Sequence, residues 1–185
     1  LDSNLRLEMR SELKRLHQSI GCTIIFVTHD QMEAMTLATS IAVMNKGKIE
    51  QIAKPMEIYN NPKSLFVAKF VGSPQMNIIN TDKEKNLALC LSKKLKIEMN
   101  KVKNFGVRPE AIKLVQKNNG DIDATIETIQ PTGADWIIGL NVSRKSMFLI
   151  SSEPPIGKEN DTIGITFKEE GCHSFDSNDL KIVKS

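Results

Sequence analysis

The residue of this sequence best placed for chemistry is His29, which directly follows the apolar run Cys22–Thr28. That run is continuous and β-branched, which is typical of a parallel strand covered on both faces. Ligands of open α/β sheets bind at the carboxyl ends of the strands, so the predicted strand places His29 at a ligand-binding edge. Taken alone, a histidine at a strand end is more often a cap or a surface residue than a catalytic one.

Two acidic residues near these positions have simpler explanations. Asp30 and Glu33 have the spacing of a capping box, which predicts a short helix through Ala38 with Asp30 as its cap rather than as a ligand. Asp2 is a candidate for an interface role, but it can equally serve as a plain N-cap of the helix that follows it.

Three other side chains could bind a ligand, and each favours an ordinary role. His17 lies in a charged helix, where we expect it to be solvated. His173, in the string GCHSFD, is predicted to be a hydrogen-bonded turn residue, because no partner lies at metal-ligand spacing. Trp136 is flanked by isoleucines, which favours packing in a strand over stacking on a ligand.

The composition excludes several classes of protein. The 185 residues are 40% hydrophobic and 25% charged with a net charge of +3, which excludes a disordered or collagen-like chain. Aromatic residues are only 5%, so the lysines lack the stacking partners of a nucleic-acid surface. No stretch approaches the roughly 20 apolar residues of a membrane span. Cys22, Cys90 and Cys172 lie far apart, and we expect reduced thiols in a cytosolic protein.

The first part of the chain has α/β character. An apolar stripe predicts a half-buried helix that ends at Gly21, and the strand Cys22–Thr28 follows. Runs at Ile41–Met44 and Lys48–Ala53 predict a hairpin across Asn45-Lys46-Gly47. Pro55 and Pro62 each predict the start of a short helix. The residues of the stripe are Leu5, Met9, Leu13, Leu16 and Ile20.

Beyond Gly72-Ser73-Pro74 the pattern changes to short runs with period-two alternation. Such runs, broken by Asn, Gly and Pro, predict a small β-barrel or sandwich. The runs are Leu87, Leu89 and Leu91; Leu95, Ile97 and Met99; Ile122, Ala124 and Ile126; and Ile163, Ile165 and Phe167.

These strings together resemble a known family. Residues 1–81 resemble the last part of the nucleotide-binding domain of ATPases from ABC importers, and closest to it the carbohydrate-uptake group that imports maltose or sn-glycerol 3-phosphate. Leu1-Asp2 look like the end of the D-loop, and VTHDQMEAM (27–35) looks like the switch-histidine loop. Three later strings, within 105–176, are similar to the regulatory barrel of that group. They are FGVRPEAIKL, IETIQPTGADWIIGLNV and ITFKEEGCHSFD.

The resemblance implies a fold and a division into domains. Residues 1–72 would be an α/β remnant of an ABC ATPase domain. Residues 73–185 would be an all-β regulatory barrel of the oligonucleotide/oligosaccharide-binding type, similar to TOBE domains.

The resemblance also implies functional roles. His29 would contact the γ-phosphate and help to place the attacking water, and Asp2 would lie at the ATP and dimer interface. The intact protein would use ATP and Mg²⁺ and work as a homodimer on the cytoplasmic, inner face of the plasma membrane. ATP-driven closure of that dimer would make a membrane permease release a carbohydrate or glycerol phosphate inward, and regulatory proteins could bind the barrel.

The sequence departs from this family at its nucleotide-binding motifs. No G-x-x-x-x-G-K-[ST] phosphate loop exists, since Gly47-Lys48 precedes Ile49 and Gly157-Lys158 precedes Glu159. The signature segment is also missing, and the Walker B carboxylates would lie before Leu1. We therefore expect this chain alone neither to bind ATP tightly nor to hydrolyse it.

Two questions stay open at this point, the packing of the first part of the chain and its function. Residues 1–70 could pair with a second copy, stay bound to a cleaved N-terminal piece, or pack differently from the family. In place of an energy-coupling subunit, the chain could be a stand-alone regulatory module that binds an oxyanion or another small ligand.

Overall fold

The computed structural model describes residues 3–183, with side chains from Leu5 onward. The chain forms two compact units that divide between Pro62 and Lys63. We call them the first and second units. Their boundary lies ten residues before the domain boundary predicted at residue 72. A division in space is not the same property as a boundary between sequence domains, so the predicted limits 1–72 and 73–185 stay a prediction.

The first unit contains three helices and one hairpin among its described residues. They are α1 (Ser3–Ile20), α2 (Gln31–Leu37), β1 (Ile41–Asn45), β2 (Lys48–Ala53) and α3 (Pro55–Asn60). β1 and β2 pair in antiparallel fashion, as predicted. Lys46 and Gly47, with φ angles of 47° and 78°, form the tight turn between them, which requires the left-handed conformation that glycine adopts freely.

Helix α1 forms where its apolar stripe predicts it. The N–H of Gly21 donates to the carbonyl of His17 at 3.0 Å, and the φ of +68° at Gly21 ends the helix. The predicted burial of the stripe is wrong, because its residues are between 39% and 56% exposed. The helix is therefore amphipathic, but the described residues do not cover its apolar face.

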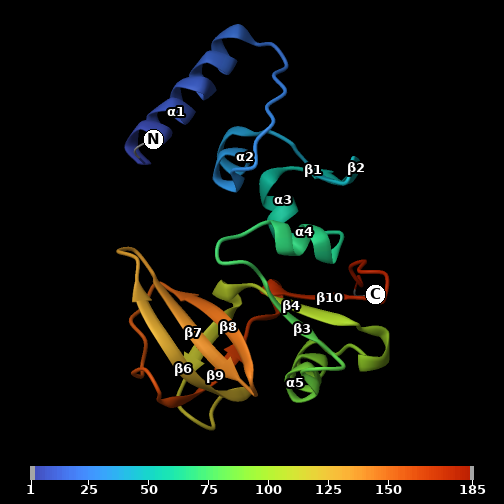
Figure 1. Cartoon of the computed structure of the whole chain (residues 1–185), viewed down its shortest axis with the longest axis vertical. Helices are drawn as coiled ribbons and strands as arrows, with labels where there is room; N and C mark the ends of the chain where they lie inside the picture. The colour runs from blue at the N-terminus through green and yellow to red at the C-terminus, as the bar shows by residue number, and fades with distance from the viewer. Residues whose placement is uncertain (1–2, 184–185) are drawn as a thin grey trace. The chain divides into compact units, whose positions relative to one another are not determined.

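The predicted strand Cys22–Thr28 is also wrong. The segment has no regular secondary structure and pairs with no described strand, and its apolar side chains are exposed. A strand needs hydrogen-bonding neighbours to form. Figure 1 shows the segment as a lone piece of chain between α1 and α2.

The second unit is built mainly of antiparallel strands. It begins with α4 (Leu65–Phe70), which starts three residues after Pro62 because Ser64 caps it through an acceptor bond from Val67 N at 3.3 Å. The remaining elements are β3 (Asn77–Asn80), α5 (Lys85–Leu95), β4 (Asn104–Val107), β5 (Ile112–Val115), β6 (Ile122–Pro131), β7 (Trp136–Val142), β8 (Lys145–Ser151), β9 (Thr162–Phe167) and β10 (Cys172–Phe175), with short 3₁₀ turns at Met99–Lys101, Pro109–Ala111 and Glu169–Gly171.

The strands of the second unit form two sheets. One has the order β10-β4-β3 and the other the order β5-β9-β6-β7-β8, and every pairing in them is antiparallel. The strands predicted around Ile122–Ile126 and Ile163–Phe167 are confirmed as parts of β6 and β9. β5 and β8, at the ends of the larger sheet, approach each other, but no ladder between them is present, so closure of a barrel is not detected.

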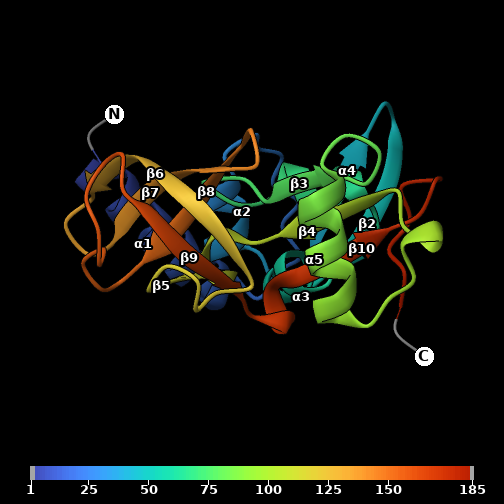
Figure 2. The ribbon, with the colours of Figure 1, turned by 90° about the horizontal axis from the view of Figure 1, so that it is seen from below.

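Most of the apolar core of the second unit forms one large cluster, and a smaller cluster of Leu65, Ala68, Met76 and Phe175 lies beside it. The large cluster draws on α5, on β3 and β4 of the smaller sheet, and on all strands of the larger one. α5 packs beside β3 (Figures 1 and 2). The two sheets and the helix are therefore layers around one core rather than separate modules.

The strands predicted from Leu87 to Met99 are wrong, because Lys85–Leu95 forms helix α5. Leu87, Leu91 and Leu95 are buried, whereas Leu89 is 46% exposed. Residues four apart lie on one face of a helix, but the same three positions also fit a period-two alternation. The burial of Ala88 beside them is helical in pattern, and tertiary packing on β3 selects the helix.

Candidate functional site: the loop around His29

His29 lies in the first unit, between the segment Cys22–Thr28 and helix α2. It is exposed, and no hydrogen bond of its imidazole is present among the described residues. The prediction placed it at the end of a buried strand. The structure leaves the histidine at the end of the same segment, but the segment itself has no sheet around it.

Asp30 caps helix α2, as the sequence predicts. Its Oδ1 accepts from the backbone N–H of Met32 at 2.8 Å and from that of Glu33 at 3.2 Å. Both bonds lower the pKa of Asp30 from its usual value, and the bond from the N–H of Glu33 has the larger effect. The positive charges of Arg6 and Arg10 lower this pKa further. The carboxylate is thus committed to the helix end rather than available as a ligand.

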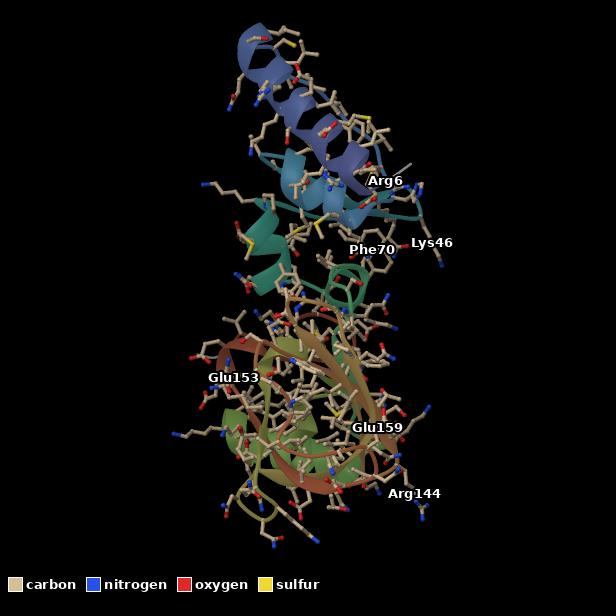
Figure 3. All side chains as sticks on the ribbon, turned by 90° about the vertical axis from the view of Figure 1, so that its left-hand side faces the viewer. Arg6, Lys46, Phe70, Arg144, Glu153 and Glu159 are labelled. Atoms are coloured by element: carbon tan, nitrogen blue, oxygen red, sulfur yellow. The ribbon has the colours of Figure 1, made fainter. Side chains whose placement is uncertain are left out.

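Arg6 links this cap to α1. Its Nη1 lies 3.5 Å from Oδ2 of Asp30, and both side chains are partly exposed. Arg6 is labelled in Figure 3. Exposed ion pairs contribute little to stability, so the contact orients α1 near the loop more than it strengthens the fold.

Glu33 does not complete the capping box in the expected way. The N–H of Asp30 donates instead to Oγ1 of Thr28 at 2.9 Å, and that hydroxyl donates to Oε2 of Glu33 at 2.7 Å. Thr28 therefore takes the place that the glutamate has in an ordinary capping box. The residues on both sides of His29 are held by these bonds, while the imidazole points to no described partner.

The chemistry available to this loop follows from these contacts. The side chains tied to it are a threonine, two carboxylates and Arg6. Carboxylates repel a phosphate, and the backbone N–H groups of Asp30, Met32 and Glu33 already donate to side-chain oxygens of the loop. The loop can offer one imidazole to a ligand that other groups bind, but it is not itself a phosphate cradle.

The other predicted site residue, Asp2, lies outside the described residues, so its place at an ATP and dimer interface stays a prediction. His17 is partly exposed. Trp136 packs against the core of the second unit, as expected. Within the described part of the chain, no group of three or more His, Cys, Asp or Glu side chains could hold a metal ion. All three cysteines are free thiols.

His173 differs from its prediction. It lies in strand β10 rather than in a turn, it is only 5% exposed, and its Nε2 has no hydrogen-bond partner among the described residues. Burial first, and then the charges of Lys181 and Arg108, lower its pKa from 6.5 to about 3. The imidazole is therefore neutral at physiological pH and belongs to the packing of the smaller sheet.

Arg108 is a residue whose role sequence reasoning missed. It is 2% exposed, and its Nη1 lies 3.3 Å from the carbonyl oxygen of Ala68 and 2.5 Å from that of Val71. These carbonyls lie at the C-terminal end of α4, where a positive charge is favourable. The sequence did contain a signal for this buried role, because Arg108 is a charged residue within the mostly apolar string FGVRPEAI.

Comparison with known proteins places this geometry in context. Residues 105–175 match the model of the TOBE domain. The chain is 38% identical over 180 residues to the sn-glycerol-3-phosphate import ATP-binding protein UgpC 2 of Rhizobium johnstonii, covering 95% of this chain and 50% of the relative. It is 40% identical over 191 residues to UgpC of Pectobacterium atrosepticum, covering 96% of this chain and 52% of that protein.

A third relative carries a less specific name. The uncharacterized ABC transporter ATP-binding protein YcjV of Escherichia coli O6:H1 is 34% identical over 189 residues, which is 96% of this chain and 52% of the relative. The chain thus spans about half the length of the curated relatives it matches.

Proposed function

We propose that this chain is the portion of an energy-coupling subunit that carries the switch histidine and the regulatory region. The proposal is supported by the similarity of the chain to ATP-binding proteins of ABC importers over about half of their length, and by its match to the TOBE domain. The observation that carries the proposal is the exposed His29, held in place by the bonds of Thr28 and Asp30 and free of any described side-chain partner. Such an imidazole can reach a nucleotide that other residues bind.

In the whole protein, His29 contacts the γ-phosphate of ATP and helps to place the attacking water, which is a positioning and electrostatic role. Mg²⁺ accompanies the nucleotide. Asp2 lies at the interface between two copies. The portion described here supplies neither a phosphate loop nor Walker B carboxylates, so this chain alone has no ATPase activity.

The finer parts of the proposal concern what is transported and where. The relatives named for sn-glycerol-3-phosphate import support a phosphorylated polyol or a carbohydrate as the cargo of the whole system. Permease subunits and a second copy of the ATPase are the partners, on the cytoplasmic face of the plasma membrane. No helix among the described residues is long and apolar enough to cross a membrane. Residues 73–185 serve as the regulatory domain, with regulatory proteins as its ligands.

The test joins this chain to the half of the Pectobacterium atrosepticum relative that it does not span. The fusion should hydrolyse ATP, and the His29→Ala variant should lose at least about 100-fold of kcat while its KM changes little. His17→Ala is the matched control and should keep full activity. Equal turnover of the His29→Ala variant and the parent fusion would contradict the proposal.

A second candidate function is a stand-alone module that binds an oxyanion or another small ligand. The observation in its favour is that residues 63–183 contain a continuous core of their own. A ligand present at 100 times its dissociation constant would add about 2.7 kcal/mol to the free energy of unfolding. A thermal-shift series with molybdate, sulfate, phosphate and sugars tests this candidate, and no shift with any of them would eliminate it.

A further inference from the structure

Positive charge is concentrated around helix α5 of the second unit. Residues 82–103 contain seven lysines and only three acidic residues. This stretch therefore carries more positive charge than the chain as a whole, whose net charge is +3. A local excess of one sign of charge attracts an oppositely charged partner and speeds its association.

Every acidic residue of this stretch already has a lysine as its ion-pair partner. The pairs are Asp82 with Lys103, Glu84 with Lys145 and Glu98 with Lys101. Lys94 is paired as well, with Asp121 of the following loop. The other four lysines of the stretch are exposed and make no ion pair within the described part of the chain. They are Lys83, Lys85, Lys93 and Lys96.

Three of these four lysines share one face of α5 with an exposed leucine. Lys85, Leu89 and Lys93 follow one another at intervals of four residues, and Lys96 caps the helix three residues later. Residues three or four apart are neighbours on the surface of a helix. We call Lys85, Leu89, Lys93 and Lys96 the basic face.

The core fixes the direction of the basic face. The buried residues of α5 lie on the opposite side of the helix, so the basic face points away from the core. α5 runs along the outside of the second unit (Figures 1 and 2). Leu89 is 46% exposed in the middle of this face. The buried residues are Leu87, Ala88, Leu91 and Leu95.

The backbone of Lys96 has a conformation that suits glycine better than lysine. Its φ of 55° and ψ of 42° lie in the left-handed region. Glycine commonly ends a helix in this conformation, because a Cβ atom makes it less favourable. A lysine at this position lowers stability without filling the core. This supports a use for its side chain beyond the fold.

The side chains of the basic face favour a protein as the partner. No aromatic ring among these four residues offers a base a surface to stack on, as single-stranded nucleic acids require. The apolar side of α5 is buried in the core, so the helix cannot insert it into a lipid layer. An apolar side chain with charged neighbours around it is instead typical of protein interfaces.

We propose that the basic face binds an acidic segment of a partner protein. Carboxylates of that segment pair with Lys85, Lys93 and Lys96, and an apolar side chain packs on Leu89. This inference rests on the proposed function, because it gives a place and a chemistry to the regulatory proteins that bind residues 73–185. The charges guide the approach of the partner, and the contact on Leu89 selects among acidic segments.

The experiment titrates the full chain with two synthetic peptides of equal length and equal negative charge. One contains glutamate and leucine with the leucines at helical spacing, and the other has serine in place of each leucine. The peptide with leucine should bind at least about tenfold more tightly. Binding of both peptides should weaken as the salt concentration rises.

Charge reversals locate the binding surface. The double variant Lys85→Glu, Lys93→Glu should lose at least about tenfold in affinity for the leucine peptide, because its new carboxylates repel those of the peptide. Lys113→Glu, Lys158→Glu is the matched control. It reverses two exposed lysines of the same unit outside α5, and its affinity should stay within about twofold of the parent.

Lys96→Gly separates binding from folding. Glycine adopts the left-handed conformation freely, so the urea midpoint of unfolding should rise. The affinity for the leucine peptide should fall at least about twofold, because one lysine of the basic face is lost. A variant that is more stable but binds less well cannot owe its weaker binding to a damaged fold.

Four results would overturn the proposal. They are equal affinities of the charge-reversal variant and its control, equal affinities for the two peptides, unchanged affinity of Lys96→Gly, and tighter binding to phosphatidylserine vesicles or single-stranded RNA than to the leucine peptide. The last result would assign the basic face to a lipid surface or to a nucleic acid.

The fusion described under the proposed function separates the two proposals. An ATPase-active fusion that does not bind the leucine peptide contradicts the basic face alone. A fusion that binds the peptide but does not hydrolyse ATP contradicts the proposed function alone.

Discussion

The side-chain amide of Asn77 makes hydrogen bonds with both backbone groups of Phe148, 71 residues later in the chain. Its Oδ1 accepts from Phe148 N at 2.8 Å, and its Nδ2 donates to Phe148 O, also at 2.8 Å. The same Nδ2 donates to the carbonyl of Val107 at 3.1 Å. Asn77 thus imitates a neighbouring strand for the edge strand β8 and joins the two sheets of the second unit.

Replacing Asn77 by alanine should destabilise the second unit. The change leaves the N–H and carbonyl of Phe148 without this partner, at a cost of about 2–4 kcal/mol. Urea denaturation measures the loss. Asn119→Ala, at an exposed position of the same unit, should change the free energy of unfolding by less than about 0.5 kcal/mol. Equal midpoints for the two variants would contradict the bridging role of Asn77.

Replacing Arg108 by methionine should loosen α4. The variant keeps much of the buried volume but removes the charged donor from the carbonyls of Ala68 and Val71, which costs about 2–4 kcal/mol. We expect a lower urea midpoint and faster amide exchange in Leu65–Phe70. Lys69→Met removes an exposed charge from the same helix and should leave both unchanged. Unaltered exchange in the Arg108 variant would show that α4 does not depend on this contact.

The stability of the second unit should fall at acidic pH in a way that depends on His173. Its pKa is about 3 in the folded chain and near 6.5 when unfolded, so the unfolded state binds the extra proton between these values. The free energy of unfolding is therefore unaffected by this histidine above pH 6.5. It falls by up to about 1.4 kcal/mol per pH unit as the pH falls toward 3.

The His173→Gln variant lacks this titration, so its free energy of unfolding should depend less steeply on pH from 6.5 down to 4. Urea melts at several pH values measure both slopes, and carboxylates that titrate in the same range affect both proteins alike. His17→Gln serves as the control. Parallel slopes for the His173 variant and the parent would show that His173 does not keep its depressed pKa.

Replacing Asp30 by alanine should unravel the start of α2. The N–H groups of Met32 and Glu33 lose their acceptor, so their hydrogen exchange should accelerate, while exchange in the second unit stays the same. Asp30→Asn keeps a side-chain oxygen and should restore most of the protection. If the asparagine variant exchanged as fast as the alanine variant, the ion pair with Arg6 rather than the cap would be the important contact.

The features predicted correctly from the sequence depend on short-range interactions, and those predicted wrongly depend on long-range ones. The end of α1 at Gly21, the cap at Asp30 and the turn at Lys46-Gly47 depend on bonds within a few residues, and all three are confirmed. The strand Cys22–Thr28 and the strands across Leu87–Met99 depend on distant partners, and both predictions are wrong. The same division applies to the candidate site. The position of His29 directly before α2 follows from the local sequence pattern, but its surroundings do not.

By itself, then, the sequence determined the family resemblance, the cap and loop that hold His29, and the absence of a phosphate loop, because motifs and caps are set by neighbouring residues. Only the tertiary structure decided that α5 is a helix, that Arg108 binds the carbonyls at the end of α4 and that Asn77 joins two sheets. These features depend on which residues far apart in the sequence come into contact. A sequence pattern that fits both a strand and a helix is decided only by which face of the segment becomes buried.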